Sequence, residues 1–240
     1  QEIFNYARSK NIEVFSTPFD EASFEYLETL GVNLYKIASM DIVNLELIRK
    51  VALTKKPIIL SCGMSTLGQV EDAVNTVKET GNVNLMLLHC NSSYPASHNE
   101  MNLNVISTLK KNFQVPVGLS DHTFGLLASH TAIAIGANLI ERHFTLDRSM
   151  QGPDHILSSE PGEMIQLVKI SKMMPELLGD GIKRIQPNEY VTLNTQRKSI
   201  YTNSFIKKGE KITKEKIIIK GPAGGLLPKY LEIVVGRIAQ

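Results

Sequence analysis

The sequence predicts an α/β protein whose larger part is an α/β barrel that lacks two of its units and whose end is a small β-rich module. Short apolar segments alternate with helical segments roughly 20–30 residues apart, which is the spacing of βαβ units in a parallel sheet. No Gly-x-Gly-x-x-Gly motif follows these segments, which counts against a dinucleotide-binding sheet. Polar residues end every apolar segment, and barrels build their active sites at the carboxyl ends of their strands.

Local signals define the order of the elements. Strands are predicted at residues 13–16, 33–38, 57–61, 84–90, 115–119 and 139–143. Helices are predicted at residues 1–10, 21–30, 45–53, 103–111, 124–137 and 161–178, with one more beginning at Thr66. Asp20 and Asn44 are suitable N-cap residues, and Thr66 with Gln69 has the form of a capping box. Gly31 is expected to end the helix that Asp20 begins.

The end of the chain has a different character. A loop at residues 147–159 follows the last predicted strand, and later β-like segments at 199–202 and 216–220 are separated by glycine-containing turns. We therefore divide the chain into a barrel domain, residues 1–185, and a β-rich domain, residues 186–240. The second domain is small for a unit that must be stable on its own.

The composition is ordinary for a globular protein, with 240 residues, 42% hydrophobic and 21% charged. The net charge of +2 is too small to argue for nucleic acid, and no apolar run is long enough to span a bilayer. Two cysteines, Cys62 and Cys90, do not make a disulfide framework, so a cytoplasmic setting is expected. Because the chain opens without Met inside a helical segment, we expect residues upstream, and the absence of a signal peptide is uninformative.

Two consecutive predicted strands end in similar polar clusters, Ser120-Asp121-His122 and Glu141-Arg142-His143. Equivalent ends of neighbouring barrel strands lie close together, so the two imidazoles could bind one divalent metal ion. A single histidine there would more often cap a strand or bond within the core. For two at matching positions beside charged residues, we favour a ligand pair.

A lysine and several hydroxyls at the strand ends could hold a phosphate through one charge and several donors. Lys36 lies within an apolar strand, where a lysine is costly unless it is paired or reaches the rim. A desolvated lysine could instead form a Schiff base, and spacing alone leaves both uses open. Cys62 and Cys90 are interpreted as small buried residues, and a dyad of Cys90 with His89 is disfavoured because strand neighbours point to opposite faces.

The motifs at these strand ends resemble those of the N-acetylneuraminate (sialic acid) synthase family, and they occur in the family's order. They are Lys36-Ile-Ala-Ser-Met-Asp41, Ser61-Cys-Gly-Met-Ser65, His89-Cys-Asn-Ser-Ser-Tyr-Pro95, Gly118-Leu-Ser-Asp-His-Thr123, Glu141-Arg-His-Phe-Thr145 and Gly152-Pro-Asp-His155. Arg197-Lys-Ser-Ile-Tyr201 resembles the opening of the family's C-terminal antifreeze-like (SAF) domain. The resemblance covers nearly the whole chain.

The resemblance implies a (β/α)8 TIM barrel that lacks its first β/α units in this chain, followed by a small β-rich SAF domain. It implies condensation of phosphoenolpyruvate with an open-chain N-acylated amino-hexose, similar to N-acetylmannosamine, to a nine-carbon 2-keto sugar acid with release of phosphate. A divalent metal ion, Mn²⁺ or Mg²⁺, would polarise the sugar aldehyde. The resemblance also implies a domain-swapped homodimer.

The resemblance also implies roles for individual residues. His122 and His143 would bind the metal ion. Asp41 would act as acid or base on the attacking water, with Tyr94 and Asp154 as further catalytic residues facing the sugar. The substrate-binding residues would be Thr17, Lys36, Ser39, Ser61, Ser92, Ser120 and Lys220.

This chain departs from the family at Asp41, where many relatives have Glu, and in a glycine-rich stretch of the second domain. Many relatives carry an Arg that reaches the sugar's acyl group, and here Gly221 occupies that place, with Lys220 as the candidate substitute. Two alternatives stay open. The first is a Schiff-base aldolase that uses Lys36, and the second is a catalytically dead carbohydrate-binding module on the same scaffold.

Overall fold

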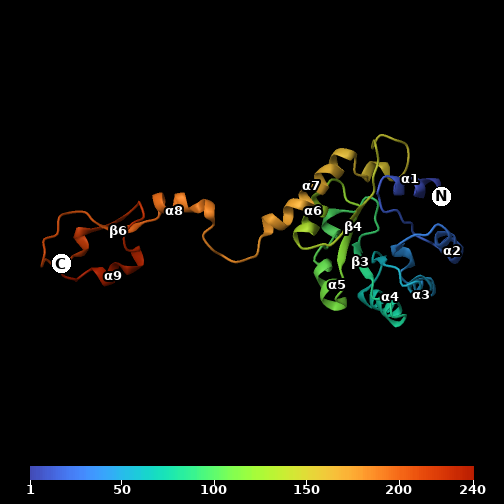
Figure 1. Ribbon diagram of the computed structural model, residues 1–240, viewed down its shortest axis with the longest axis horizontal. Helices are drawn as coiled ribbons and strands as arrows, with labels where there is room; N and C mark the ends of the chain where they lie inside the picture. Colours follow the sequence, from blue (N-terminus) through green and yellow to red (C-terminus); the bar gives the residue numbers. More distant parts are fainter. The chain divides into compact units, whose positions relative to one another are not determined.

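The computed structural model describes residues 1–240 as two compact units, Gln1–Gly179 and Asp180–Gln240 (Figure 1). The division between them lies a few residues before the boundary expected from the sequence. No helix in the protein combines the length and the apolar character needed to cross a membrane.

The first unit is built on one parallel five-stranded sheet, in which each strand pairs with the next one along the chain. The strands are β1 (Tyr35–Ile37), β2 (Ile58–Ser61), β3 (Leu85–Cys90), β4 (Val117–Asp121) and β5 (Ile140–Arg142). The sheet curls as half of a barrel, with the helices around its outer side (Figure 1). The predicted parallel α/β fold is confirmed at this level.

One predicted strand is absent. Residues 13–16 were expected to begin the sheet, but they form no strand, so the sheet has five strands where the sequence suggested six. A strand requires ladder hydrogen bonds, and this segment makes none with β1. Val14 and Phe15 instead line an apolar groove with Phe4 and Leu27, so their side chains pack against helices.

The helices follow the predicted order, and their starts are set by local sequence. They are α1 (Glu2–Ser9), α2 (Glu21–Thr29), α3 (Leu45–Leu53), α4 (Leu67–Glu79), α5 (Val105–Phe113), α6 (Leu127–Ala134) and α7 (Pro161–Leu178). Asp20 accepts the backbone N–H of Ser23 at 2.6 Å, which satisfies one free donor at the start of α2. Asn44 caps α3, and the capping box of Thr66 and Gln69 is formed at α4. These cap predictions are confirmed.

The two faces of the sheet have different chemistry. Tyr35, Ile37, Leu60, Leu87 and Leu119 point toward the helices and are fully buried in the main hydrophobic core. Each such side chain contributes about 1.5–3 kcal/mol on burial. The alternate residues of the same strands point to the concave face, because strand side chains alternate. The register aligns Ser61 with Leu88 and Cys90 with Ser120, so the polar strand-end residues share that concave face.

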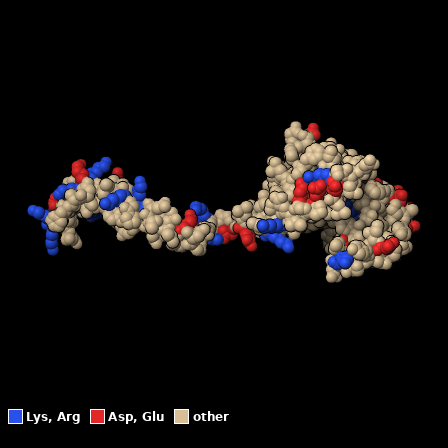
Figure 2. Space-filling model, turned by 90° about the horizontal axis from the view of Figure 1, so that it is seen from above, with Lys and Arg blue, Asp and Glu red and all other residues tan.

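The second unit contains one antiparallel hairpin, β6 (Ser199–Thr202) with β7 (Ile217–Lys220), and two short helices, α8 (Tyr190–Gln196) and α9 (Leu231–Val234). Ser199 is its single buried residue, and Phe205 is 82% exposed. The unit therefore lacks an apolar core of its own. Lys and Arg outnumber Asp and Glu on its surface (Figure 2). Its assignment as a SAF domain stays a prediction.

Candidate active site

The concave face of the sheet gathers most of the predicted site residues. Lys36, on the edge strand β1, lies with its Nζ 3.5 Å from Glu141 Oε2 on the opposite edge strand β5. The contact crosses the curled sheet, so the two edges approach each other over a shared polar surface. The side chain of Lys36 is only 15% exposed, which explains why an ionic partner is present.

Two predicted serines meet around Gly63, just beyond the end of β2. The backbone N–H of Gly63 donates to Ser39 Oγ at 3.0 Å. A Cβ placed on Gly63 would lie 2.8 Å from Ser39 Oγ and 2.3 Å from Ser92 Oγ, so both hydroxyls border the space beside this glycine. The oxygen of Ser39 accepts from Gly63, so its hydroxyl is left with the role of a donor.

Two buried oxygen atoms near these serines have no hydrogen-bond partner. They are Ser61 Oγ, in a residue that is 1% exposed at the end of β2, and Asp41 Oδ2, in the 3₁₀ turn that follows β1. An unpaired buried polar group costs about 1–3 kcal/mol, so such atoms call for an explanation. Ser61 lies on the concave face by register, so a polar ligand bound there would give its hydroxyl a partner.

The two predicted imidazoles converge. The ring centroids of His122 and His143 are 5.3 Å apart and meet edge to face. Tyr94 stacks on His122 with centroids 4.1 Å apart and lies 5.5 Å from His143. Asp154 Oδ2 is 3.6 Å from His143 Nδ1, which brings the predicted sugar-facing pair, Tyr94 and Asp154, beside the imidazoles.

Electrostatics distinguish the two imidazoles. Burial lowers the pKa of His122, but hydrogen bonds with Cys90 and with the carbonyl of Asn91 outweigh it, so the net pKa is raised. Burial lowers the pKa of His143, and the positive charge of His122 lowers it further. Burial and the charges of Cys90 and Asp154 raise the pKa of Tyr94, so its phenol keeps the proton that it could donate.

Sequence reasoning missed the central role of Glu141. Its Oε1 accepts from Ser120 Oγ at 2.6 Å while its Oε2 faces Lys36, and its charge also acts on both imidazoles. The hydroxyl hydrogen of Ser120 is therefore directed at Glu141 rather than toward a ligand. The sequence did contain a signal for this role. Glu141 lies two residues before His143 on the same strand, and residues i and i+2 of a strand point to the same face, so its carboxylate had to face the site.

A second feature missed from the sequence is the environment of Cys90. Its Sγ lies 3.9 Å from His122 Nδ1 and 3.8 Å from Ser92 Oγ. Burial opposes ionisation, but His122 and the hydroxyls of Ser39 and Ser92 prevail, so the pKa of Cys90 is lowered. Cys90 and His89 form no dyad, as the sequence predicted, because the His89 ring bonds to the Met101 carbonyl instead.

Two predicted binding residues lie apart from this cluster. Thr17 lines the groove between the N-terminal helices with Phe15 and Leu27, and it makes no hydrogen bond to the other predicted residues. Lys220 belongs to the second unit, where its Nζ lies 5.6 Å from the ring of Tyr201.

A divalent metal ion at this site would have two imidazoles as its protein ligands. Two imidazoles are available, and no group of three or more His, Cys, Asp and Glu side chains is arranged as a metal site. His122 Nδ1 lies 2.8 Å from the Asn91 carbonyl, the outer contact that commonly fixes a metal-binding imidazole and leaves Nε2 free. The imidazoles of His122 and His143 suit a divalent ion that takes its further ligands from water or substrate, and the metal site stays a prediction.

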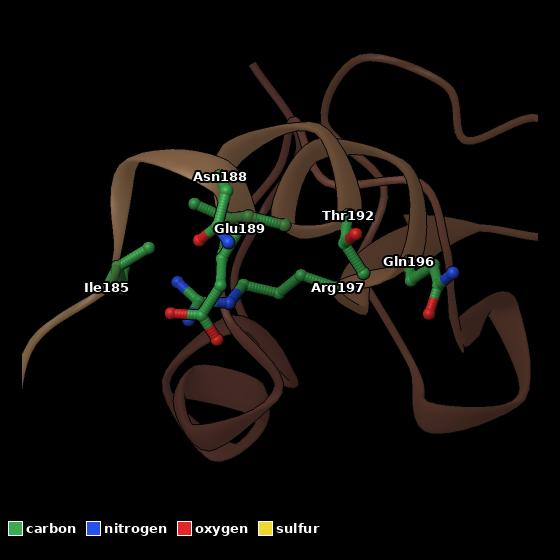
Figure 3. A pocket seen from close by; sticks show the side chains of 7 residues that line it. Ile185, Asn188, Glu189, Thr192, Gln196 and Arg197 are labelled. Atoms are coloured by element: carbon green, nitrogen blue, oxygen red, sulfur yellow. The ribbon is translucent and has the colours of Figure 1, made fainter. Parts of the chain in front are cut away.

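A different hollow lies in the second unit and has no comparable chemistry. Its volume is about 580 Å³, and it is lined by Ile185, Asn188, Glu189, Thr192, Leu193, Gln196 and Arg197. Glu189 and Arg197 extend toward one another there (Figure 3). It contains none of the predicted site residues, so side-chain chemistry rather than hollow size identifies the candidate site.

Known proteins resemble the chain along nearly all its length. A model of the NeuB family matches residues 1–183. The chain is 42% identical to the N,N'-diacetyllegionaminic acid synthase of Campylobacter jejuni, covering 100% of this chain and 72% of that protein. It is 37% identical to the pseudaminic acid synthase of Helicobacter pylori, covering 99% of this chain and 70% of that protein. A crystal structure of N-acetylneuraminic acid (sialic acid) synthetase from Leptospira borgpetersenii with citrate matches with a TM-score of 0.74 and 37% identity, covering 80% of this chain and 68% of that one.

Proposed function

The chain belongs to the NeuB family, and from this membership we propose that its protein is a sialic-acid-type synthase. It condenses phosphoenolpyruvate with an open-chain N-acylated amino-hexose to a nine-carbon 2-keto sugar acid. In this reaction the enol carbon C3 bonds to the aldehyde carbon of the sugar. Water then adds at C2, and the tetrahedral carbon expels phosphate together with the bridging oxygen, leaving the ketone.

The serine and lysine half of the concave face binds phosphoenolpyruvate in this proposal. Lys36 supplies a positive charge, and Ser39 and Ser92 present hydroxyls on either side of Gly63. The unpartnered hydroxyl of Ser61 finds an acceptor on the anion. Charge-assisted hydrogen bonds of this kind are short and strong, which suits an anionic substrate.

The imidazole half binds the sugar. His122 and His143 hold a divalent metal ion, which when bound polarises the sugar aldehyde. Tyr94 and Asp154 orient the sugar beside the imidazoles. Asp41, whose Oδ2 is buried and unpartnered, accepts the proton of the water that adds at C2.

One observation carries the proposal: Glu141 joins the two halves. It contacts Lys36 and Ser120 on the anion side, and its charge reaches both imidazoles on the other. An anion and a polarised aldehyde held on these two sides would be neighbours, as bond formation between them requires. Glu141 Oε2 already contacts the amine that a Schiff base would need, which argues against the aldolase.

The sugar is proposed by class. The chain is 42% identical to an N,N'-diacetyllegionaminic acid synthase and 33% identical to the human N-acetylneuraminate-9-phosphate synthase. The higher identity favours a hexose with two acetamido groups as the substrate. The test incubates the intact protein with phosphoenolpyruvate, Mn²⁺ and each of a mono- and a diacetamido hexose. Equal amounts of phosphate and of a nine-carbon keto acid are expected. Borohydride trapping of pyruvate on Lys36 would favour the aldolase, and no turnover with any sugar would favour the binding module.

Assembly is part of the proposal. The second unit lacks an apolar core, so contact with another surface would stabilise it. It also carries Lys220 beside a glycine-rich loop. We propose that it covers the concave face of a second copy in a two-fold dimer. Mixing an inactive His122→Ala chain with an inactive chain truncated after Gln186 should restore turnover. A fully active monomer would contradict the dimer.

A further inference from the structure

A buried ion pair lies directly behind the two imidazoles. Arg142 Nη1 is 2.5 Å from Asp121 Oδ2, and the two side chains are 1% and 0% exposed. Asp121 precedes His122 and Arg142 precedes His143, each at the end of its strand. Because successive strand residues point to opposite faces, the ion pair occupies the helix side of the sheet while the imidazoles occupy the concave side.

Asp121 is fully satisfied by groups that hold the end of β4. Its Oδ1 accepts the backbone N–H of Thr123 at 2.9 Å and the Thr123 hydroxyl at 2.8 Å. Its Oδ2 accepts from Ser129 Oγ on α6 at 2.5 Å in addition to Arg142. The residues on both sides of His122 are therefore fixed to one carboxylate.

Arg142 uses its remaining donors to hold the segment that follows β5. Its Nε donates to Ser159 Oγ at 2.7 Å, and its Nη2 donates to the carbonyls of Thr123 at 2.9 Å and Leu157 at 3.3 Å. The backbone N–H of Ser159 also donates to the His143 carbonyl at 2.8 Å. One guanidinium thus joins the ends of β4 and β5 to the turn that carries Asp154.

Stability alone is a weak reason for this arrangement. A buried ion pair pays a desolvation cost that often matches its Coulombic gain, and a well-packed apolar pair of similar size can be equally stable. A fully satisfied buried network does fix geometry, since each member holds the others in one arrangement. Its neighbours on the concave side are His122, His143 and Asp154.

We infer that Asp121 and Arg142 are positioning residues that fix the separation of the two imidazoles and hold Asp154 against them. The identity of what the imidazoles bind rests on the proposed function, whereas the positioning itself does not. Both side chains are buried on the helix side of the sheet, so both act through the residues that follow them on the strands.

The test replaces both members in the intact protein. Removing one charge would leave the other buried and unpaired, which can unfold the protein. The paired variant Asp121→Asn/Arg142→Gln removes both charges together, so that neither is left unpaired. Near-ultraviolet circular dichroism checks its fold. Arg49→Gln/Glu79→Gln neutralises an exposed ion pair remote from the concave face and is the matched control. The Ser159→Ala variant, which removes one hydrogen bond of Arg142 and leaves the ion pair in place, is the second probe if the paired variant does not fold.

Two measurements decide the inference. Calorimetric Mn²⁺ titration is expected to show affinity about 10–100-fold weaker in the paired variant, the usual effect of losing a residue that orients a metal ligand. Without metal, carbethoxylation of His122, which is 3% exposed, should become roughly tenfold faster because the strand end opens more often. The control variant should match the wild type in both. A folded paired variant with wild-type Mn²⁺ affinity and wild-type His122 modification would overturn the positioning role.

The two measurements also separate this inference from the proposed function. If the wild type neither binds Mn²⁺ nor makes keto acid, the proposed function fails. The modification rate of His122 still decides whether Asp121 and Arg142 hold it in place. Weakened Mn²⁺ binding together with an unchanged KM for phosphoenolpyruvate supports positioning of the imidazole half alone.

Discussion

Replacing Gly63 with alanine should damage phosphoenolpyruvate binding far more than folding. The added Cβ would lie 2.3 Å from Ser92 Oγ, 2.8 Å from Ser39 Oγ and 3.1 Å from Ser39 Cβ. Ordinary contacts between such atoms begin at about 3.5 Å, so the Ser92 hydroxyl must move by roughly 1 Å. The backbone itself accepts alanine, because Gly63 is not among the residues with positive φ.

The expected magnitude follows from the hydrogen bonds that are lost. A hydrogen bond to a charged group contributes about 1.5–3 kcal/mol. Displacing one of the two hydroxyls should therefore weaken phosphoenolpyruvate binding by roughly tenfold to a hundredfold, since 1.4 kcal/mol is a factor of ten. Rotation of Ser92 relieves the shortest contact, so we expect an overpacking cost near the lower end of about 1–3 kcal/mol.

The assay is calorimetric titration of phosphoenolpyruvate into the intact protein, with thermal unfolding as the check on folding. Gly68→Ala is the matched control, because Gly68 lies in α4 and its added Cβ would meet nothing within 4 Å. That control should bind normally and gain about 0.4–1 kcal/mol of stability. A folded Gly63→Ala variant with unchanged affinity would refute an anion site between Ser39 and Ser92.

Three further predictions concern single side chains. Lys36→Ala should weaken phosphoenolpyruvate binding by about 1.5–3 kcal/mol in the same titration, while Lys56→Ala, which removes a lysine paired with Glu28, should not. Thr66→Ala should cost about 1 kcal/mol of unfolding free energy in urea, because it removes the capping box of α4, and no loss would contradict that cap. Burial raises the pKa of Cys62 to about 12, so iodoacetamide at pH 8 should leave it unmodified until the protein unfolds. Rapid labelling of Cys62 itself in the native protein, located by peptide mass spectrometry, would contradict this.

Features that depend on neighbours in sequence were predictable. The caps at Asp20, Asn44 and Thr66 require only a side chain and the backbone three residues on, and all three are formed. The strand expected at residues 13–16 failed because a ladder needs a partner, and Val14 and Phe15 pack on helices instead.

Features that depend on how distant strands align were predictable only in part. The convergence of His122 and His143 was expected from their matching places at strand ends, and their rings do approach. The bridge from Lys36 to Glu141 requires the two edge strands to curl toward each other, which no local pattern encodes. The contact of Cys90 with His122 likewise depends on how β3 and β4 align.

The source of the released phosphate's oxygen tests the central claim most directly. The intact protein, Mn²⁺ and a diacetamido hexose are incubated with phosphoenolpyruvate that carries ¹⁸O in its bridging position. Phosphorus NMR then follows the label. Addition of water at C2 predicts that phosphate appears only when the sugar is present and that it retains the ¹⁸O. Phosphate released without sugar, or ¹⁸O found in the keto group of the product, would contradict condensation at this site.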